Sequence, residues 1–314
     1  GILMDMVKQA LVACPALTRI LRACAIVPDP DSLLANKERR LGGGLRLPIA
    51  EEIAVPFQFF GTSGAVPSPG RDNTALAFYS KDEVVLVDCP GSPYQKILKA
   101  GLDPIRVSSL IVTHRHVDHV YGIPSLAHNM GLAGRRTTLH VYALAETMQI
   151  LRGFMDLFPL EAKMPYRIEL HDVPGKEGHE VLRARGLRIL STPVKHGAPN
   201  IGLRVEFDLP GERGVVVYSS DTSQCPSLVA LARAADVLIH EATFLHSDAA
   251  RAAADGHTTG YQAGEVAKQA GVKRLFLCHF SADLHGREDE LRQEAMRSFG
   301  GPVEIPEELR EYRV

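Results

Sequence analysis

The sequence predicts an α/β fold in which two β-sheets are covered by helices on their outer faces. Short apolar runs typical of buried strands recur from residue 55 onward, and amphipathic stretches typical of helices are interspersed among them. The 314 residues are 45% hydrophobic and 23% charged, which is the composition of a globular protein that can bury a full core. No fixed-period repeat points to a different architecture.

The first residues of the chain differ in pattern from the rest. Apolar residues recur at helical spacing between residues 3 and 24, and Pro15 divides this stretch, so a helical hairpin is expected there. A proline-rich break and three consecutive glycines then mark the exit from it. We therefore expect residues 1–54 to be a helical extension and linker with a structural or oligomeric role, and residues 55–314 to be the main domain.

Turn residues divide the main domain into strands and helices. The expected strands lie at residues 55–60, 74–79, 84–88, 109–112, 138–142, 167–170, 187–193, 201–207, 214–218, 237–240 and 274–278. The expected helices lie at residues 93–100, directly after residue 119, and at 145–158, 227–233, 261–270 and 288–298. Strands and helices alternate regularly in the last third, as they do where helices cover a sheet.

Charge, hydropathy and cysteine pattern exclude several classes of protein. The net charge of −2 gives no general attraction for nucleic acid, so a polyanion would have to meet a local basic patch. No apolar run approaches the roughly 18 residues of a membrane span, so no membrane association is expected. The five cysteines form no Cys-x-x-Cys pair, which disfavours a disulfide framework or a thiolate zinc site and is typical of the reducing cytoplasm.

The stretch from His114 to His119 packs three imidazoles and one carboxylate into six positions. Because it follows the apolar run at residues 109–112, we expect it on a loop at the end of a buried strand, where active sites of α/β proteins collect. Imidazole nitrogens and a carboxylate oxygen form a borderline ligand set that favours zinc over calcium or magnesium. A solvated histidine-rich loop is the weaker alternative.

Three later residues occupy the same kind of position at the end of a predicted strand. His196, Asp221 and His279 each follow an apolar run, although each alone could be an ordinary core, surface or helix-capping residue. If the loops meet at one rim, seven side chains make two metal sites that share Asp221. A water between two cations is deprotonated near neutral pH, so the sequence predicts a hydrolytic two-metal site.

Several separate blocks of the chain match one known family. They lie at residues 60–67 (FGTSGAVP), 87–89 (VDC), 114–119 followed by 122–124 (GIP), 218–222 (YSSDT), 239–244 (IHEATF), 257–259 (HTT) and 278–281 (CHFS). From Phe57 to Pro302 the chain resembles the metallo-β-lactamase superfamily, and within it the ribonuclease Z branch. The resemblance implies a four-layer αββα sandwich for the main domain.

The resemblance also implies a role for each matching residue. One zinc ion would be held by His114, His116 and His196, the other by Asp118, His119 and His279, with Asp221 bridging the two. Asp118 would also orient the attacking hydroxide. His257, backed by Glu241, would assist proton transfer to the leaving group, which suits an imidazole whose tautomer is fixed by a carboxylate. The alternative for Glu241 is a helix-capping or salt-bridge residue, and Mn²⁺ or iron could replace zinc.

The remaining histidines are expected to be ordinary surface or core residues. His240 lies on an apolar strand beside Glu241, and we expect it to be hydrogen-bonded and structural. The others lack partners at ligand spacing along the sequence, and these are His128, His140, His171, His179, His246 and His285.

Two departures from the ribonuclease Z pattern bear on the substrate. Residues 208–213 form only a short turn where those enzymes carry a longer insertion, and no glycine- and proline-rich basic arm lies between His119 and His196. In place of the arm, residues 145–164 carry apolar side chains at Met148, Leu151, Phe154, Met155, Phe158 and Met164. These are core residues by default, but above the metals they would form an apolar wall suited to a small ester.

We therefore expect a dinuclear zinc-dependent hydrolase that uses a metal-bridging hydroxide on a phosphodiester or a related ester. The expected partner is a small-molecule ester or phosphodiester, with RNA not favoured, and a cytoplasmic homodimer is expected. Three alternatives stay open. They are tRNA 3′-end processing, hydrolysis of a carboxylic ester, lactone, thioester or sulfate ester, and a metal-stabilised binding or scaffold protein.

Overall fold

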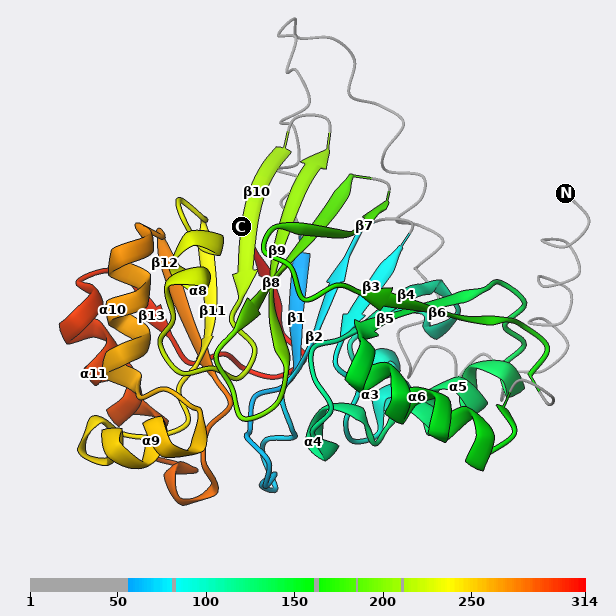
Figure 1. Cartoon of the computed structure of the whole chain (residues 1–314), viewed down its shortest axis with the longest axis horizontal. Coiled ribbons are helices and arrows are strands. Elements are labelled where there is room, and N and C mark those ends of the chain that lie inside the picture. The colour runs from blue at the N-terminus through cyan, green and yellow to red at the C-terminus, as the bar shows by residue number, and fades with distance from the viewer. Residues whose placement is uncertain (1–55, 81–82, 161–163, 185, 210–211) are drawn as a thin grey trace, which may run out of the picture. The chain divides into compact units, whose positions relative to one another are not determined.

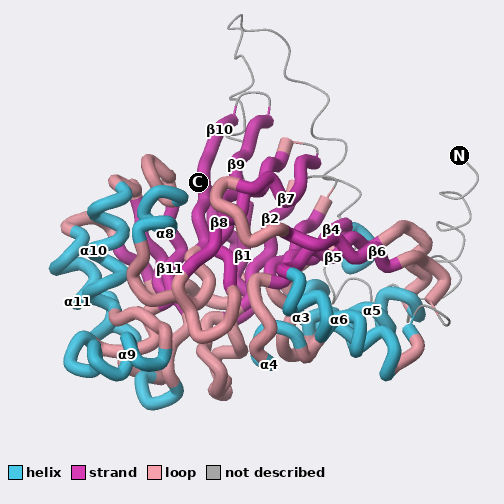
Figure 2. The backbone as a smooth tube through the Cα atoms, in the orientation of Figure 1, coloured by secondary structure: helices cyan, strands magenta, loops and turns pink. Residues whose placement is uncertain are grey.

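The computed structural model describes residues 56–80, 83–160, 164–184, 186–209 and 212–314. Within this part of the chain, two seven-stranded sheets lie face to face, and helices cover the outer side of each (Figure 1). Figure 2 shows the strands in the middle of the domain and the helices on its two flanks. The predicted αββα sandwich is confirmed, while the predicted N-terminal helical hairpin lies outside the described residues.

The first sheet has the strand order β14-β1-β2-β3-β4-β5-β6. Its strands are β14 (Glu311–Arg313), β1 (Pro56–Gly61), β2 (Ala75–Tyr79), β3 (Val84–Val87), β4 (Val107–Val112), β5 (Leu139–Leu144) and β6 (Ile168–Val173). Strands β3 to β6 are parallel, so each connection between them crosses over the sheet. The crossovers contain α3 (Pro93–Lys99), η2 (Pro104–Arg106), α4 (Val117–Val120), α5 (Ile123–Leu132) and α6 (Ala145–Leu157).

The second sheet has the order β13-β12-β11-β10-β9-β8-β7. Its strands are β13 (Val303–Glu304), β12 (Arg274–Cys278), β11 (Val237–Glu241), β10 (Glu212–Tyr218), β9 (Asn200–Leu209), β8 (Leu187–Val194) and β7 (His179–Ala184). Strands β7 to β10 form an antiparallel meander, and β10 to β13 are parallel. The remaining helices are α8 (Pro226–Leu231), η3 (His246–Asp248), α9 (Ala249–Asp255), α10 (Gly260–Ala270), η4 (Ala282–Leu284) and α11 (Glu288–Phe299).

A cluster of buried aromatic rings joins the two sheets. Phe57 and Phe59 of β1 contact Phe276 of β12, with ring centroids 5.8 and 5.6 Å apart. Tyr312 of β14 lies 4.9 Å from the same Phe276 ring. Burying one such ring stabilises the fold by about 1.5–3 kcal/mol. The cluster therefore holds β1 and β14 of the first sheet against β12 of the second.

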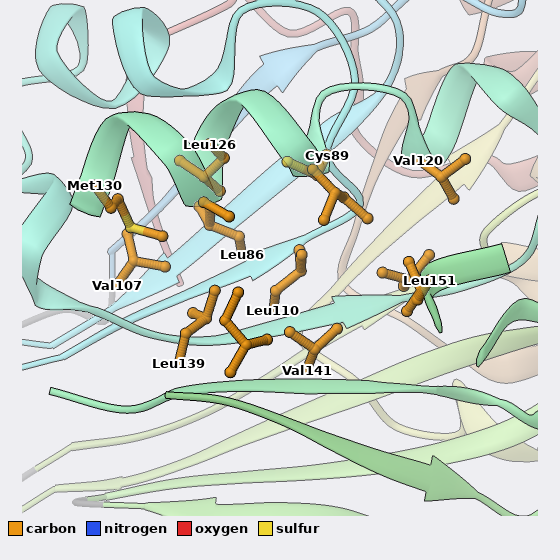
Figure 3. Close-up of a cluster of buried hydrophobic side chains, with 14 of the residues drawn as sticks. Leu86, Cys89, Val107, Leu110, Val120, Leu126, Met130, Leu139, Val141 and Leu151 are labelled. Atoms are coloured by element: carbon orange, nitrogen blue, oxygen red, sulfur yellow. The ribbon is translucent and has the colours of Figure 1, made fainter. Parts of the chain in front are cut away.

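Each sheet also has its own hydrophobic core, which lies between the sheet and the helices that cover it. Figure 3 shows the core of the first sheet, where Leu110 and Val141 of the strands lie near Leu126 of α5 and Leu151 of α6. On the other side of the domain, α10 packs against α11 so closely that a Cβ added at Gly264 would lie 2.4 Å from the carbonyl oxygen of Ala295. Only glycine allows that approach of two backbones.

The structure contains short elements that the sequence pattern does not predict. These are β7, β13, β14 and α9, and the expected helix after residue 119 is divided into α4 and α5. Strands β9 and β10 are longer than predicted, since β9 extends to Leu209 and β10 begins at Glu212, inside the segment expected to be a turn. None of the described helices combines the length and hydropathy that crossing a bilayer requires.

Candidate metal centre

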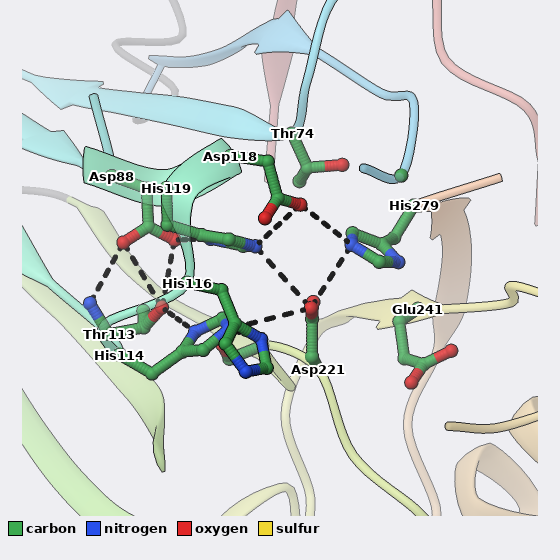
Figure 4. A network of polar contacts seen from close by, with 12 residues as sticks. Thr74, Asp88, Thr113, His114, His116, Asp118, His119, Asp221, Glu241 and His279 are labelled. Carbon is green, nitrogen blue, oxygen red and sulfur yellow. Dashed lines mark hydrogen bonds and ion pairs between the residues drawn. The ribbon is translucent and has the colours of Figure 1, made fainter. Parts of the chain in front are cut away.

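The residues predicted as metal ligands lie on loops at one rim of the sandwich. They are His114 and His116 after β4, Asp118 and His119 in α4, His196 after β8, Asp221 after β10 and His279 after β12. Parallel strands of both sheets end at this rim, which is where α/β sheets place their ligand sites. Figure 4 shows several of these side chains, drawn from both sheets, pointing toward one another.

The first group of ligand atoms is centred on His116. Its Nδ1 lies 3.0 Å from Nε2 of His114 and 3.1 Å from Nε2 of His196. Oδ2 of Asp221 completes the group at 3.7 Å from Nε2 of His114. Within this group every ligand atom lies within 4.8 Å of the others. Three imidazoles and one carboxylate so placed match the four-coordinate donor set of zinc.

The second group joins Asp118, His119 and His279. Oδ2 of Asp118 lies 3.5 Å from Nε2 of His119 and 3.8 Å from Nε2 of His279. Oδ2 of Asp221 is closer to the same two nitrogens, at 3.4 and 3.1 Å. Asp221 thus lies between both groups, and the structure brings all seven predicted ligands together.

Buried polar atoms without a hydrogen-bond partner indicate whether this centre suits cations. Nε2 of His119, Nε2 of His279 and Oδ1 of Asp221 are buried and have no hydrogen-bond partner in the described part of the chain. Each buried polar atom left without a partner costs about 1–3 kcal/mol. Divalent cations held by the two groups would satisfy these atoms, so the residues present fit a pair of divalent cations.

Two of the histidine ligands, His119 and His196, are each fixed in orientation by a hydrogen bond at Nδ1, the ring nitrogen that faces away from the ligand group. Oδ2 of Asp88 lies 2.8 Å from Nδ1 of His119, and Oδ1 of Asp88 accepts a hydrogen bond from the backbone N–H of Thr113. Nδ1 of His196 donates to the carbonyl of Gly256 at 2.9 Å. A proton fixed on Nδ1 turns the Nε2 lone pair toward the metal position. The sequence alone does not single out Asp88 or Thr113, although Asp88 belongs to one of the matching blocks.

Burial and charge set the protonation of the centre. Burial, followed by the charge of His119, holds the pKa of His114 well below its usual value. Burial also lowers the pKa of His119, but the carboxylates of Asp221 and Asp88 outweigh it and hold that pKa well above its usual value. Burial raises the pKa of Asp221, but His279 and His119 outweigh it, so this carboxyl stays ionised. Cations binding here would release the imidazole protons.

The buried Glu241 and the partly buried His257 form a pair beside the ligands. Oε1 of Glu241 lies 2.8 Å from Nδ1 of His257, and the His257 ring stacks on the ring of His279 with centroids 5.2 Å apart. The carboxylate is held in place by three backbone N–H donors, from Thr222, Thr243 and Thr258. One ring nitrogen of His257 lies within 4.8 Å of ligand atoms of Asp221 and His279. Glu241 therefore makes the contacts of a carboxylate that orients an imidazole.

Three backbone positions at the centre have left-handed conformations. Asp88, Ser220 and His279 have φ values of 60°, 52° and 61°. Non-glycine residues held in this region cost of order 1 kcal/mol each and cluster at functional sites. Each lies one or two residues after the end of a strand, at the rim where the ligand side chains meet.

The other histidines divide into two kinds. His240 is buried and its Nδ1–H donates to the carbonyl of Glu241 at 2.7 Å, as expected of a structural residue. His140 and His171, however, lie 3.0 Å apart and form a compact group with Glu169. The expectation that these two lack partners at ligand spacing is wrong, because β5 and β6 bring residues far apart in the chain side by side.

Comparisons with known proteins agree with this geometry. A family model described as a beta-lactamase superfamily domain matches residues 84–280. Ribonuclease Z from Methanothermobacter thermautotrophicus is 30% identical over 297 aligned positions, covering 80% of this chain and 94% of that protein. The metallo-beta-lactamase fold protein YhfI from Bacillus subtilis has a TM-score of 0.71 and 23% identity, covering 84% of this chain and 100% of its own. Human tRNase Z, short form, has a TM-score of 0.67 and 23% identity, covering 82% of this chain and 99% of its own.

The expected partner, a small-molecule ester with RNA not favoured, is wrong. The relatives that match most of the chain are named ribonuclease Z, and a tRNase Z shares its fold. The expectation rests on the apolar side chains of residues 145–164, and the structure shows that several of them belong to the core. Met148, Leu151 and Met155 of α6 are buried in the core between this helix and the first sheet. They stabilise the fold and carry no information about the substrate.

Proposed function

This chain belongs to the metallo-β-lactamase superfamily, in its ribonuclease Z-like branch, and on that premise we propose that it processes the 3′ end of precursor transfer RNA. The protein is a metal-dependent hydrolase, and residues 55–314 form the hydrolase domain in this proposal. One observation carries it: two ligand groups share Asp221 directly beside the His257–Glu241 pair. Cleavage of a phosphodiester needs both parts, since charge develops on the phosphate and a proton must reach the leaving oxygen.

In this proposal each ligand group holds one zinc ion. His114, His116 and His196 would hold the first, Asp118, His119 and His279 would hold the second, and Asp221, which belongs to both ligand groups, would be available to both. When bound, the two cations would lower the pKa of the attacking water and stabilise negative charge on the phosphate. The Asp118 side chain is 15% exposed, whereas that of Asp221 is 2% exposed. Asp118 is therefore the carboxylate that can orient a water entering from solvent.

His257 supplies the proton for the leaving group. Burial lowers the pKa of His257, but the adjacent Glu241 carboxylate outweighs it and raises the pKa above the usual value. Glu241 accepts the Nδ1–H, so the proton that can be donated is the one on Nε2. An imidazole with a raised pKa beside the two ligand groups can hold the proton that this step requires.

The rim also offers contacts for RNA. Arg115 lies between two ligands of the first group and is exposed, and Lys195 directly precedes His196. These two cations supply the local positive charge that a net charge of −2 does not, and backbone phosphates bind such charges.

A groove of about 600 Å³ is lined by Tyr121, two residues after His119, and by Phe154 and Phe158. Unpaired bases of RNA stack on aromatic side chains of this kind. The apolar lining is therefore compatible with RNA and does not require a small ester.

A cleavage assay with metal-quantified protein tests the proposal. The protein should cut a precursor transfer RNA once, at the junction of the mature 3′ end and the trailer, as seen on a denaturing gel. Asp221→Ala and His257→Ala should each lower the rate by at least about 100-fold, whereas Asp156→Ala on the exposed face of α6 should not. Arg115→Ala should raise KM for the RNA and leave hydrolysis of bis(p-nitrophenyl) phosphate unchanged.

The parallel assay separates the substrate from the chemistry. Hydrolysis of bis(p-nitrophenyl) phosphate without cleavage of precursor transfer RNA would refute the proposed substrate. Failure on both substrates with metal bound would refute the phosphodiesterase mechanism. Reconstitution with Zn²⁺, Mn²⁺ or Fe²⁺ before the assay identifies the metal, since availability as well as ligand type decides occupancy.

A further inference from the structure

A second group of metal-ligating side chains lies on β5 and β6, away from the rim. His140 of β5 pairs across the parallel ladder with Glu169 of β6, and His171 is two residues further along β6. Side chains two residues apart on a strand point to the same face, so all three share one face of the sheet. β6 is the edge strand of this sheet (Figure 1), and the three side chains are half-buried.

The distances in this group match those of the catalytic ligands. Nδ1 of His140 lies 3.0 Å from Nε2 of His171 and 3.5 Å from Oε2 of Glu169. His114 and His116 show the same 3.0 Å between ring nitrogens. Two nitrogens bound to one tetrahedral zinc at about 2.0–2.1 Å lie roughly 3.3–3.4 Å apart, so the two rings would separate by only about 0.3–0.4 Å to hold a cation.

Neighbouring side chains hold the group in place. The ring of Tyr142, two residues after His140, stacks on the ring of His171 with centroids 4.7 Å apart and planes 17° apart. Arg167 lies 3.7 Å from Oε1 of Glu169, which leaves Oε2 facing His140. Two imidazoles and a carboxylate oxygen, with one ring braced by stacking, form a preorganised ligand set.

A second carboxylate, that of Glu83, acts on the tyrosine that stacks on His171. Burial, then the charges of Glu83 and Glu169, raise the pKa of Tyr142, so both carboxylates act on this ring. Oε2 of Glu83 is buried and has no hydrogen-bond partner among the described residues. The local field therefore favours a cation.

We propose that His140, Glu169 and His171 bind a divalent transition-metal ion, such as Zn²⁺, at a site separate from the catalytic centre. His140 also pairs with Ser109 of β4, four residues before Thr113, which places the group roughly 13 Å along the strand from the metal-binding loop. Nitrogen and oxygen donors of this kind select zinc, nickel or copper over calcium or magnesium. A bound ion would link the edge strand β6 to β5 and stabilise that side of the sheet.

Zinc counting on the full chain tests the site independently of catalysis. Wild-type protein should bind one more equivalent of Zn²⁺ than the His140→Ala/His171→Ala variant, as measured by calorimetric titration and by elemental analysis after gel filtration. Excess Zn²⁺ should also raise the Tm of the wild type more than that of the variant, because a ligand that binds only the folded state stabilises it. His179→Ala, which removes a half-buried histidine from β7 in the other sheet, should behave as the wild type.

A shape-conserving variant keeps the test decisive if the double variant folds poorly. Glu169→Gln preserves the side-chain shape and removes the charge, and it should weaken binding of the additional equivalent by at least about tenfold. Hydrolysis of bis(p-nitrophenyl) phosphate should be the same in all these proteins, whatever the natural substrate is. An equal zinc count in wild type and double variant, or unchanged affinity in Glu169→Gln, would overturn the proposed site.

Discussion

Asp88 offers a sharp test of how the catalytic cations are held. Its carboxylate is buried, lies 2.8 Å from Nδ1 of His119, and also accepts the N–H of Thr113. A buried hydrogen bond to a charged group contributes about 1.5–3 kcal/mol, and about 1.4 kcal/mol corresponds to a tenfold change in binding. Asp88→Asn should therefore weaken the metal site of Asp118, His119 and His279 by about 10–100-fold, which is the loss typical of a residue that orients a ligand.

Competition with a chelator measures this effect. As chelator is added, the variant should lose its first cation at a concentration about 10–100-fold lower than the wild type does, and its second cation near the wild-type concentration. Asp103→Asn, which changes an exposed side chain capping η2, serves as the matched control. Thermal unfolding confirms that the metal-loaded variant is folded. Equal weakening of both cations, or of neither, would refute the idea that Asp88 acts through His119.

Two further predictions concern proton donation and helix packing. Glu241→Gln should move the basic limb of the pH–rate profile to lower pH, because burial lowers the pKa of His257 and the Glu241 carboxylate is what raises it. The donor is active below its pKa, so activity should then fall earlier as pH rises, and an unchanged limb would mean that another group titrates. Gly264→Ala should destabilise the fold by about 1–3 kcal/mol in denaturant unfolding, since its Cβ would meet the α11 backbone. A Cβ added at Gly153 of α6 would meet no other atom, so Gly153→Ala should stabilise the fold by about 0.5–1 kcal/mol. Equal changes in the free energy of unfolding for the two variants would contradict the packing argument.

The strands that the sequence predicts are those with a continuous apolar run. In β4 and β12 nearly every residue is buried, so hydrophobicity alone reveals them. In contrast, β13 contains two residues and β14 three, too few to show any period. These strands exist because β12 and β1 offer them a free edge to pair with. Short edge strands are therefore a property of the assembled sheet rather than of their own sequence.

The same reasoning explains why the sequence predicts the metal ligands but not the residues that hydrogen-bond to them. The predicted ligands each follow an apolar run, which is a local signal. The contact of Asp88 with His119 and that of His140 with His171 each join residues 31 positions apart. Such pairs depend on which strands become neighbours and in which register, and one sequence read alone does not contain that information. The unpredicted parts of the site are therefore those that arise from tertiary pairing.

The apolar residues of the α6 segment led to the wrong expectation of a small-ester substrate because the sequence pattern presents most of them as one surface. The apolar side chains of this segment belong to two faces of the helix. The inward face recurs at i, i+3 and i+7, the spacing of a core-facing stripe, and consists of Met148, Leu151 and Met155. The side chains of this segment that line the groove are Phe154, Leu157, Phe158, Leu160 and Met164. Leu157 is 70% exposed and Phe158 is 48% exposed, although burying either apolar side chain would stabilise the fold. A substrate argument can rest only on side chains that folding leaves exposed, and here those are the aromatic and branched side chains that line the groove together with Tyr121. Such a surface can hold unpaired bases, which a wall of buried methionines could not do.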